Sequence, residues 1–154
     1  MRAPAVYIDT SVIGGCFDPE FQQESTKLFD LIDKAIISGY CSKITLNEIE
    51  NFLNLDKQKH LLKLAEKLKV LPLNQEAIEL SAEYLREGIL SPKSLSDAQH
   101  IAIASVNNLD VIVSWNFKHI VNFRKIPQFN LINLKLGYRQ IEIRSPQEII
   151  YSYE

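Results

Sequence analysis

Short runs of apolar residues recur along the chain and predict its strands. The clearest run, Ala5–Ile8, stops abruptly at Asp9, which predicts a buried strand with an acid at its carboxyl end. The run at residues 110–114 is apolar almost throughout, which is typical of a strand covered on both faces. Weaker runs predict three further strands, at residues 40–44, 70–73 and 140–144.

Between these runs, apolar residues recur every three or four positions, which is the spacing of a helix with one buried face. Helices are predicted at residues 24–38, from near Thr45, and at residues 56–68, 75–87 and 95–106, with a helical turn at 117–121. Gly39 and Gly88 stand where a glycine would end the helices before them. The repeated order of strand and helix predicts an α/β three-layer sandwich around a mainly parallel sheet.

Composition favours one ordinary domain. A chain of 154 residues with 46% hydrophobic content can bury a single core, so we predict one domain over residues 1–154. Cys16 and Cys41 are too few for a disulfide framework, and no secretory signal opens the chain, which predicts a cytoplasmic protein with free thiols. No apolar run approaches the roughly 18 to 20 residues needed to span a bilayer, so we exclude a membrane partner.

Charge is distributed unevenly, although the formal net charge is only -2. No acidic residue occurs between Asp110 and Glu142, and the same window contains the basic residues Lys118, Arg124, Lys125, Lys135 and Arg139. This stretch could offer a basic face to phosphates, or it could simply solvate a surface, and the sequence favours neither interpretation.

Acidic residues stand where the predicted strands end. Asp9 ends the first strand, and Glu48 and Asp97 fall in the first turn of their predicted helices. Asn116 follows the strand at 110–114. Because the carboxyl ends of parallel strands share one edge of a sheet, we expect the four side chains to converge there. Such an oxygen-rich cluster suits Mg²⁺ or Mn²⁺, and a cation would offset the repulsion among the carboxylates.

Each of these residues also has a purely structural interpretation. Glu48 and Asp97 each stand three residues after a Thr or Ser, which is the spacing of a helix capping box. Asn116 could cap the helical turn that follows it, and Asp9 could form a turn with Ser11. The occurrence of the whole set at one sheet edge favours the metal site.

Three nearby basic residues carry less information. His100 lies on an otherwise apolar helix, so we interpret it as packed or capping rather than catalytic. Lys118 and His119 could contact a substrate phosphate, or they could be solvated on the surface of the turn.

The residues around the three acids resemble the motifs of the PIN-domain family, and especially of VapC-like toxins. The segment Val-Tyr-Ile-Asp-Thr-Ser is similar to the family's first motif, in which the aspartate, here Asp9, binds metal and the Ser/Thr two residues later, here Ser11, supports the site. Ile-Thr-Leu-Asn-Glu-Ile, with Glu48, resembles the second motif. Leu-Ser-Asp-Ala-Gln-His-Ile-Ala, with Asp97, resembles the third, which is the most specific. The resemblance covers essentially the whole chain.

The fourth motif departs from the family pattern. Many PIN domains have Thr-x-Asp after the fourth strand, whereas this chain has Ser114, a Trp and Asn116. The asparagine keeps an oxygen ligand but removes a negative charge, which puts the rate of any reaction in question.

The resemblance implies a PIN-like fold and a metal-dependent endoribonuclease that hydrolyses RNA phosphodiester bonds with Mg²⁺ or Mn²⁺. It implies that the catalytic residues and metal ligands are Asp9, Glu48, Asp97 and Asn116. We expect the substrate to be bound by Ser11, Ser114, Lys118 and His119. Family members commonly form homodimers, and the toxins are neutralised by a small antitoxin, so RNA, a second copy and an antitoxin are the expected partners.

Two alternatives remain. One is a PIN-like domain that is catalytically weak or inactive and binds RNA or a protein. The other is a phosphotransfer domain of the haloacid-dehalogenase or receiver type, which also has an aspartate after the first strand. The dehalogenase pattern needs a second Asp where this chain has Ser11, and the receiver pattern needs paired acids before the first-strand Asp.

Overall fold

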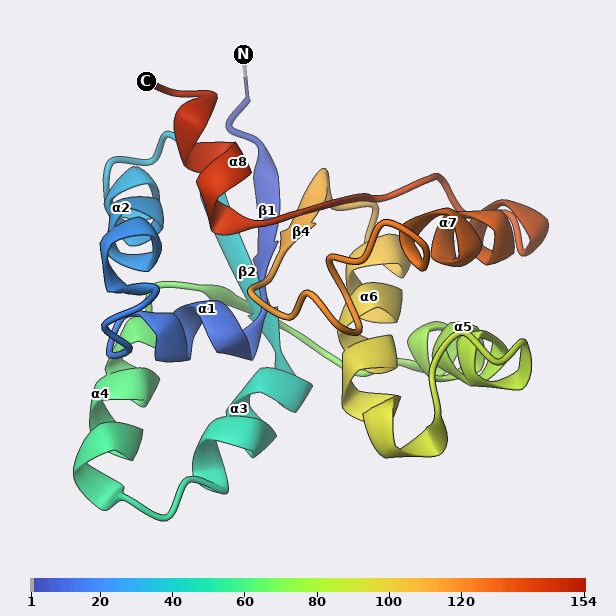
Figure 1. Ribbon diagram of the computed structural model, residues 1–154, viewed down its shortest axis with the longest axis horizontal. Coiled ribbons are helices and arrows are strands. Elements are labelled where there is room, and N and C mark those ends of the chain that lie inside the picture. Colours follow the sequence, from blue (N-terminus) through green and yellow to red (C-terminus); the bar gives the residue numbers. More distant parts are fainter. Residues whose placement is uncertain (1) are drawn as a thin grey trace.

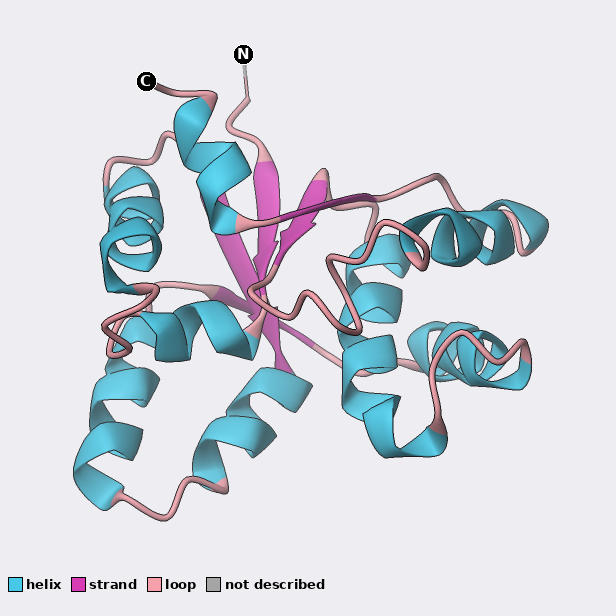
Figure 2. Cartoon of the chain, viewed as in Figure 1, coloured by secondary structure: helices cyan, strands magenta, loops and turns pink. Residues whose placement is uncertain are grey.

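The computed structural model describes residues 2–154 and shows a five-stranded sheet with helices on both faces (Figures 1 and 2). All neighbouring strands are parallel, in the order β3-β2-β1-β4-β5. The strands are β1 (Ala5–Ile8), β2 (Ser38–Ser42), β3 (Lys69–Leu71), β4 (Val111–Val113) and β5 (Glu142–Arg144). The predicted α/β three-layer sandwich is therefore confirmed, and its sheet is parallel throughout.

Eight α-helices complete the layers within residues 2–154. They are α1 (Thr10–Gly15), α2 (Gln22–Asp33), α3 (Lys43–Glu50), α4 (Leu55–Ala65), α5 (Gln75–Arg86), α6 (Leu95–Val106), α7 (Ile126–Lys135) and α8 (Pro146–Tyr151). Figure 1 shows α1, α2, α4 and α8 on one side of the strands and α5, α6 and α7 on the other. None of the helices described is long and apolar enough to cross a membrane.

The central strand separates two hydrophobic cores. Successive side chains of a strand point to opposite faces, so Val6 and Ile8 belong to the core shared with α1, α2, α4 and α8. Ala5 and Tyr7 belong to the core shared with α5, α6 and α7. All four residues of β1 are buried, which explains why the run is apolar without alternation.

The predicted helix at 24–38 is too long. Helix α2 ends at Asp33, and Ala35 closes it in the left-handed region with a φ of 57°. Gly39 is not a helix cap, because it lies inside β2. A Cβ atom there would come within 2.6 Å of the Leu68 side chain, so close packing requires the glycine. Gly88, in contrast, ends α5 with a φ of 76°, as predicted.

Helix α3 begins earlier than predicted. Its first residue is Lys43, and Ser42 caps it by accepting a hydrogen bond from the backbone N–H of Ile44. The capping box is formed by Ser42 and Thr45, so the interpretation of Glu48 as a capping acid is wrong. Glu48 lies in the second turn of the helix rather than in the first, which leaves its side chain available for other contacts.

Three helices were not predicted. Residues after Asp9 were expected to form a turn, but they form α1, whose Gly14 and Gly15 conceal the helical pattern. Helices α7 and α8 lie in the last third of the chain, where the apolar spacing is irregular. Cys16 and Cys41 are buried and free of disulfides, as expected.

Candidate metal centre

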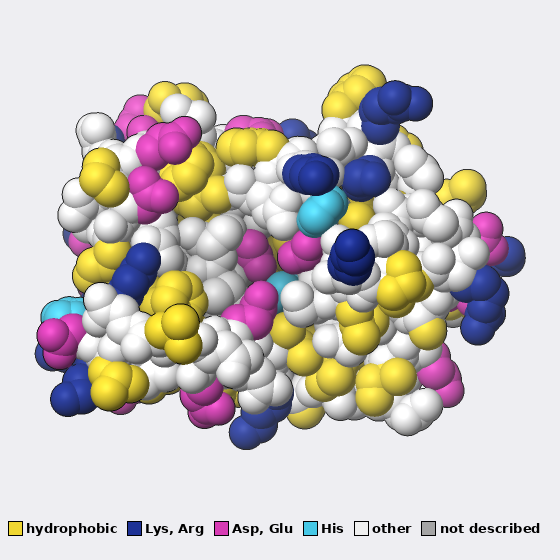
Figure 3. All heavy atoms as spheres, turned by 60° about the horizontal axis from the view of Figure 1, so that its bottom comes forward, with side chains coloured by type: hydrophobic (Ala, Val, Ile, Leu, Met, Phe, Trp, Pro, Cys, Tyr) yellow, Lys and Arg dark blue, Asp and Glu magenta, His cyan; other side chains and the backbone are white. Residues whose placement is uncertain are grey.

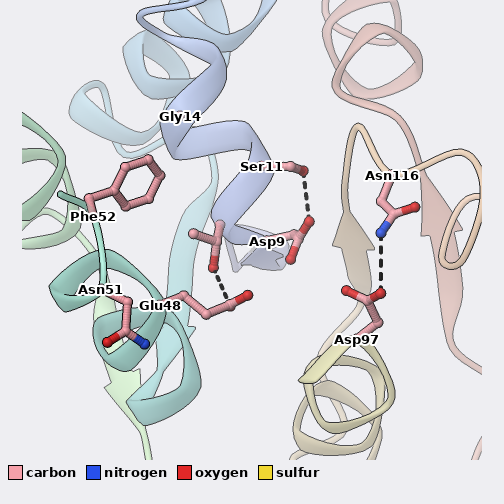
Figure 4. A pocket seen from close by; sticks show the side chains of 9 residues that line it. Asp9, Ser11, Gly14, Glu48, Asn51, Phe52, Asp97 and Asn116 are labelled. Carbon is pink, nitrogen blue, oxygen red and sulfur yellow. Dashed lines mark hydrogen bonds between the residues drawn. The ribbon is translucent and has the colours of Figure 1, made fainter. Parts of the chain in front are cut away.

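The carboxyl-end edge of the sheet holds all four predicted ligands. Asp9 directly follows β1, Glu48 lies on α3, Asp97 lies in the first turn of α6, and Asn116 follows β4. They line one pocket of about 460 Å³, together with Thr10, Ser11, Gly14, Asn51 and Phe52 (Figure 4). Figure 3 shows acidic side chains gathered in a hollow of this face, with basic and hydrophobic side chains around it.

Two serines hold Asp9, whose side chain is almost completely buried. Its Oδ2 accepts hydrogen bonds from the hydroxyls of Ser11 and Ser114, both at 2.7 Å. Ser11 also accepts a hydrogen bond from the backbone N–H of Trp115 at 3.0 Å, and Ser114 accepts one from the backbone N–H of Asn116 at 2.9 Å. The structure thus places both serines on Asp9, where they tie the end of β1 to the loop after β4.

Glu48 is held from the protein core. Its Oε1 accepts hydrogen bonds from the Thr10 hydroxyl at 2.8 Å and from Nε2 of His100 at 2.6 Å. His100 is completely buried, and its Nδ1 lies 2.6 Å from the hydroxyl of Tyr7. The same hydroxyl lies 2.7 Å from Oγ of Ser42, the cap of α3. A continuous chain of hydrogen bonds therefore links the start of α3 to the carboxylate it carries.

This chain of hydrogen bonds shifts the pKa values of Glu48 and His100. Burial raises the pKa of Glu48, but the hydrogen bond and charge of His100 and the hydrogen bond of Thr10 outweigh it, so the pKa lies below its usual value. Burial lowers the pKa of His100, but its hydrogen bond to Glu48 and the charges of Asp9, Glu48 and Asp97 outweigh it, so the pKa of the imidazole is raised.

Asp97 is held by the loop after β4. Its Oδ2 accepts hydrogen bonds from Nδ1 of His119 at 2.9 Å and from Nδ2 of Asn116 at 3.3 Å. Burial and the charge of Asp9 raise the pKa of Asp97 against the lowering effect of His119 and His100. Ser94 forms no side-chain cap at the start of α6, so the interpretation of Asp97 as part of a capping box is wrong.

Asn116 combines both interpretations given to it. Its Oδ1 accepts a hydrogen bond from the backbone N–H of His119 at 2.9 Å, which caps the turn, while its Nδ2 contacts Asp97. The exposed Lys118 lies between Asn116 and His119 in the sequence. One residue of the basic stretch lies away from the pocket. Arg139 donates to the backbone carbonyl of Asn108, before β4, at the opposite edge of the sheet.

Within residues 2–154, no group of three or more His, Cys, Asp or Glu side chains is arranged closely enough to form a complete metal-binding cluster. The donors nevertheless fit a hard cation, because Mg²⁺ takes only one or two carboxylates and completes its shell with water and phosphate oxygens. Oδ2 of Asp9, Oε1 of Glu48 and Oδ2 of Asp97 accept the hydrogen bonds described above. The second carboxylate oxygens of Glu48 and Asp97 point into the pocket (Figure 4).

Sequence reasoning missed two contributors to this site. Thr10 was taken as part of a turn, and His100 was interpreted as a packed residue. His100 is indeed buried, but it also donates to Glu48. The signal was its position three residues after Asp97, which places both on one face of α6.

Comparisons with known proteins agree with this architecture. The model of the PIN domain family matches residues 6–119. A chain of VapBC2 from Rickettsia felis, solved with a DNA fragment, superposes with a TM-score of 0.60 at 14% identity, covering 92% of this chain and 98% of that one. A chain of DNA-bound VapBC from Salmonella typhimurium has a TM-score of 0.59 at 20% identity, covering 95% and 99%. A chain of VapBC-1 from nontypeable Haemophilus influenzae has a TM-score of 0.60 at 15% identity, covering 93% of this chain and 98% of that one. No curated protein matches the sequence. These structural similarities concern the fold.

Proposed function

Since the chain belongs to the PIN-domain family, we propose that it is a metal-dependent endoribonuclease that hydrolyses RNA phosphodiester bonds. The observation that carries the proposal is the convergence of Asp9, Glu48 and Asp97 on one pocket, with Asn116 beside them. Three carboxylates at one sheet edge carry like charges, and burial, together with the charge of Asp9, raises the pKa of Asp97. A bound cation would offset the negative charge of the pocket.

Each residue has a role that follows from its contacts. Asp9 and Asp97 would hold the ion directly or through water, and Asn116 would orient the Asp97 carboxylate through the hydrogen bond from its Nδ2. A bound Mg²⁺ or Mn²⁺ supplies charge neutralisation at the scissile phosphate and a more acidic water. Glu48 has a lowered pKa, so it is ionised at neutral pH and can accept a hydrogen bond from an attacking water. Thr10 and His100 fix the orientation of Glu48 through its other oxygen.

The structural similarity to chains of VapBC complexes supports a toxin with an antitoxin partner. We further propose that the protein is cytoplasmic and forms a homodimer, as the family resemblance implies. Large apolar side chains are exposed on the loops that carry the pocket, including Leu53 after α3 and Phe123 after Asn116, which are 98% and 92% exposed. A partner that covers the pocket would bury them. We propose that a substrate phosphate contacts His119, which is bonded to Asp97, and the exposed Lys118.

Asn116 favours a second candidate function. A fourth acid would add charge for a second ion, whereas the amide of Asn116 donates a hydrogen bond to Asp97. The alternative is therefore a PIN-like domain with weak or no catalysis that binds RNA or a protein.

Cleavage of a mixed-sequence RNA by the purified protein tests the proposal, with Mg²⁺ or Mn²⁺, with EDTA, and with the Asp97→Asn variant. We expect metal-dependent cleavage that EDTA abolishes and that the variant reduces at least about 100-fold. Asp110→Asn is the matched control, because Asp110 precedes β4 at the opposite edge of the sheet. Absence of cleavage, together with no Mg²⁺ binding by calorimetry, would overturn the nuclease and favour the binding domain.

A further inference from the structure

A second pocket adjoins the acidic one. It has a volume of about 430 Å³, within the range of about 300–1,000 Å³ that is usual for ligand sites. It shares Ser11, Gly14 and Asn116 with the acidic pocket, so the two form one continuous groove. Its other lining residues are Gly15, Asp18, Phe21, Lys57 and Trp115. This second part of the groove carries none of the three proposed carboxylate ligands.

Aromatic rings form one wall of this second pocket. Phe21 stacks on Trp115, with ring centroids 4.4 Å apart and planes 21° apart. Phe117 packs edgewise on Trp115, with ring centroids 6.2 Å apart, and is half exposed. Trp115 is fixed, because its Nε1 donates to Ser25 at 2.9 Å and its backbone N–H donates to Ser11. Trp115 is itself buried, so the partly exposed Phe21 offers the ring on which a nucleobase can stack, with little preference for sequence.

A lysine stands where the two pockets meet. Lys57 lines the second pocket, and its Nζ lies 5.4 Å from the ring centroid of Phe52, which lines the acidic pocket. Its ammonium group forms no ion pair within residues 2–154. The charge of Lys57 is therefore available to a phosphate that passes from one pocket to the other.

Gly14 keeps the junction of the pockets open. It lies inside α1, where glycine weakens a helix relative to alanine. Packing does not require it, because a Cβ atom at Gly14 would meet no other atom within 4 Å. At the neighbouring Gly15, by contrast, a Cβ atom would come within 2.5 Å of Oγ of Ser25. The space above Gly14 belongs to the groove, so the missing side chain leaves room for a ligand.

We propose that the second pocket binds the nucleotide next to the scissile phosphate of a single-stranded RNA, with its base against Phe21, which rests on Trp115, and its connecting phosphate near Lys57. This assignment rests on the proposed nuclease function. Asp18 would repel a phosphate inside the pocket, which favours the base and ribose there and the phosphate at the junction. A paired duplex cannot use the site, because its bases are already stacked.

Short single-stranded RNAs with one abasic position test the proposal, since they keep every phosphate and remove one base. We expect one abasic position beside the cleavage site to lower kcat/KM by about 5-fold to 100-fold. Phe21→Leu should lower kcat/KM on the intact RNA to a similar extent, and the abasic penalty should then disappear because the variant has already lost the stacking partner.

Two further variants separate binding from folding. Gly14→Ala should raise the melting temperature by about 2–4 °C, because alanine favours the helix, and yet lower kcat/KM several-fold. Lys57→Gln should reduce the slope of log affinity against log salt by about 0.7. Lys59→Gln, on the exposed face of the same helix, is the matched control for Lys57→Gln and should leave this slope unchanged.

The outcomes distinguish this proposal from the nuclease function. Cleavage at equal rates of all abasic RNAs would overturn the nucleotide site and leave the nuclease intact. If the protein does not cut any RNA, the nuclease function fails, and the affinity of the same RNAs, measured by fluorescence anisotropy with Mg²⁺, decides the site by itself. A loss of affinity for one abasic RNA and for Phe21→Leu supports it; equal affinities overturn it.

Discussion

Glu48 and Asp97 lie in the same pocket, but the protein holds them in different ways. Glu48 accepts hydrogen bonds from Thr10 and from the completely buried His100, so its support comes from the core. Asp97 accepts hydrogen bonds from Asn116 and His119, so its support comes from a surface loop. The pKa of Glu48 is lowered, and the pKa of Asp97 is raised.

The difference shows how one pocket can prepare two carboxylates for different tasks. A carboxylate that is stabilised without metal stays ionised and oriented, as an orienting group for water needs to be. A carboxylate that is buried near another acid gains most when a cation arrives, as a metal ligand does. Under the proposed function, the hydrogen bonds divide the site into a side around Glu48 that is prepared without metal and a side around Asp97 that a cation would stabilise.

The largest expected effect comes from breaking the core support of Glu48. Tyr7→Phe removes the hydroxyl between His100 and Ser42 and leaves buried polar atoms without a partner. We expect the free energy of unfolding to fall by about 1–3 kcal/mol, measured by urea denaturation. Cleavage should weaken as well, because His100 then holds Glu48 less firmly.

Tyr40→Phe is the matched control, since the half-buried Tyr40 lies in the neighbouring strand β2 and is not part of the hydrogen-bonded chain from Ser42 to Glu48. Its free energy of unfolding should change by less than about 0.5 kcal/mol. Equal losses in the two variants would show that the chain from Ser42 to Glu48 contributes nothing specific.

A smaller effect is expected when Glu48 and Asp97 are compared directly by substitution in metal-free protein at pH 7. Glu48→Gln removes the charge that His100 stabilises, and we expect a loss of about 1 kcal/mol, reduced because the side chain is 35% exposed. Asp97→Asn removes a repulsion with Asp9 and keeps an oxygen for His119, so stability should be unchanged or higher by up to about 1 kcal/mol. Urea unfolding in EDTA measures both. If Asp97→Asn is the more destabilising variant, the division of the pocket is wrong.

Local sequence patterns were sufficient to find the pocket acids that follow a strand or begin a helix. Asp9 after an apolar strand and Asp97 at the start of an apolar helix were both identified, because the sheet edge follows from strand direction. The role of His100 could not be identified, because its partner Glu48 lies 52 residues away in the sequence and only the fold brings them together. The spacing of a capping box also could not separate a cap from a pocket acid, since both place an acid in or near the first turn.

The same limit applies to the fold. Strands β1 and β4 are buried on both faces, so their apolar runs were unambiguous. Helix α1 is only six residues long and contains two glycines, so its helical character depends on its packing against α2 and α4 rather than on propensity.

The smallest expected effect concerns a carboxylate on neither side of the pocket. The backbone N–H of Ala5 donates to Asp110 at 2.7 Å, and with the guanidinium of Arg2 it lowers the pKa of Asp110. Its stabilising effect is thus fully present above the unfolded pKa of about 3.9 and is lost as the pH falls through the lower folded value. Asp110→Asn should cost about 0.5 kcal/mol at pH 7, discounted because the side chain is 34% exposed, and nothing near pH 2. A difference that stays constant from pH 7 to pH 2 would mean that the charge of Asp110 is not what stabilises the strand end.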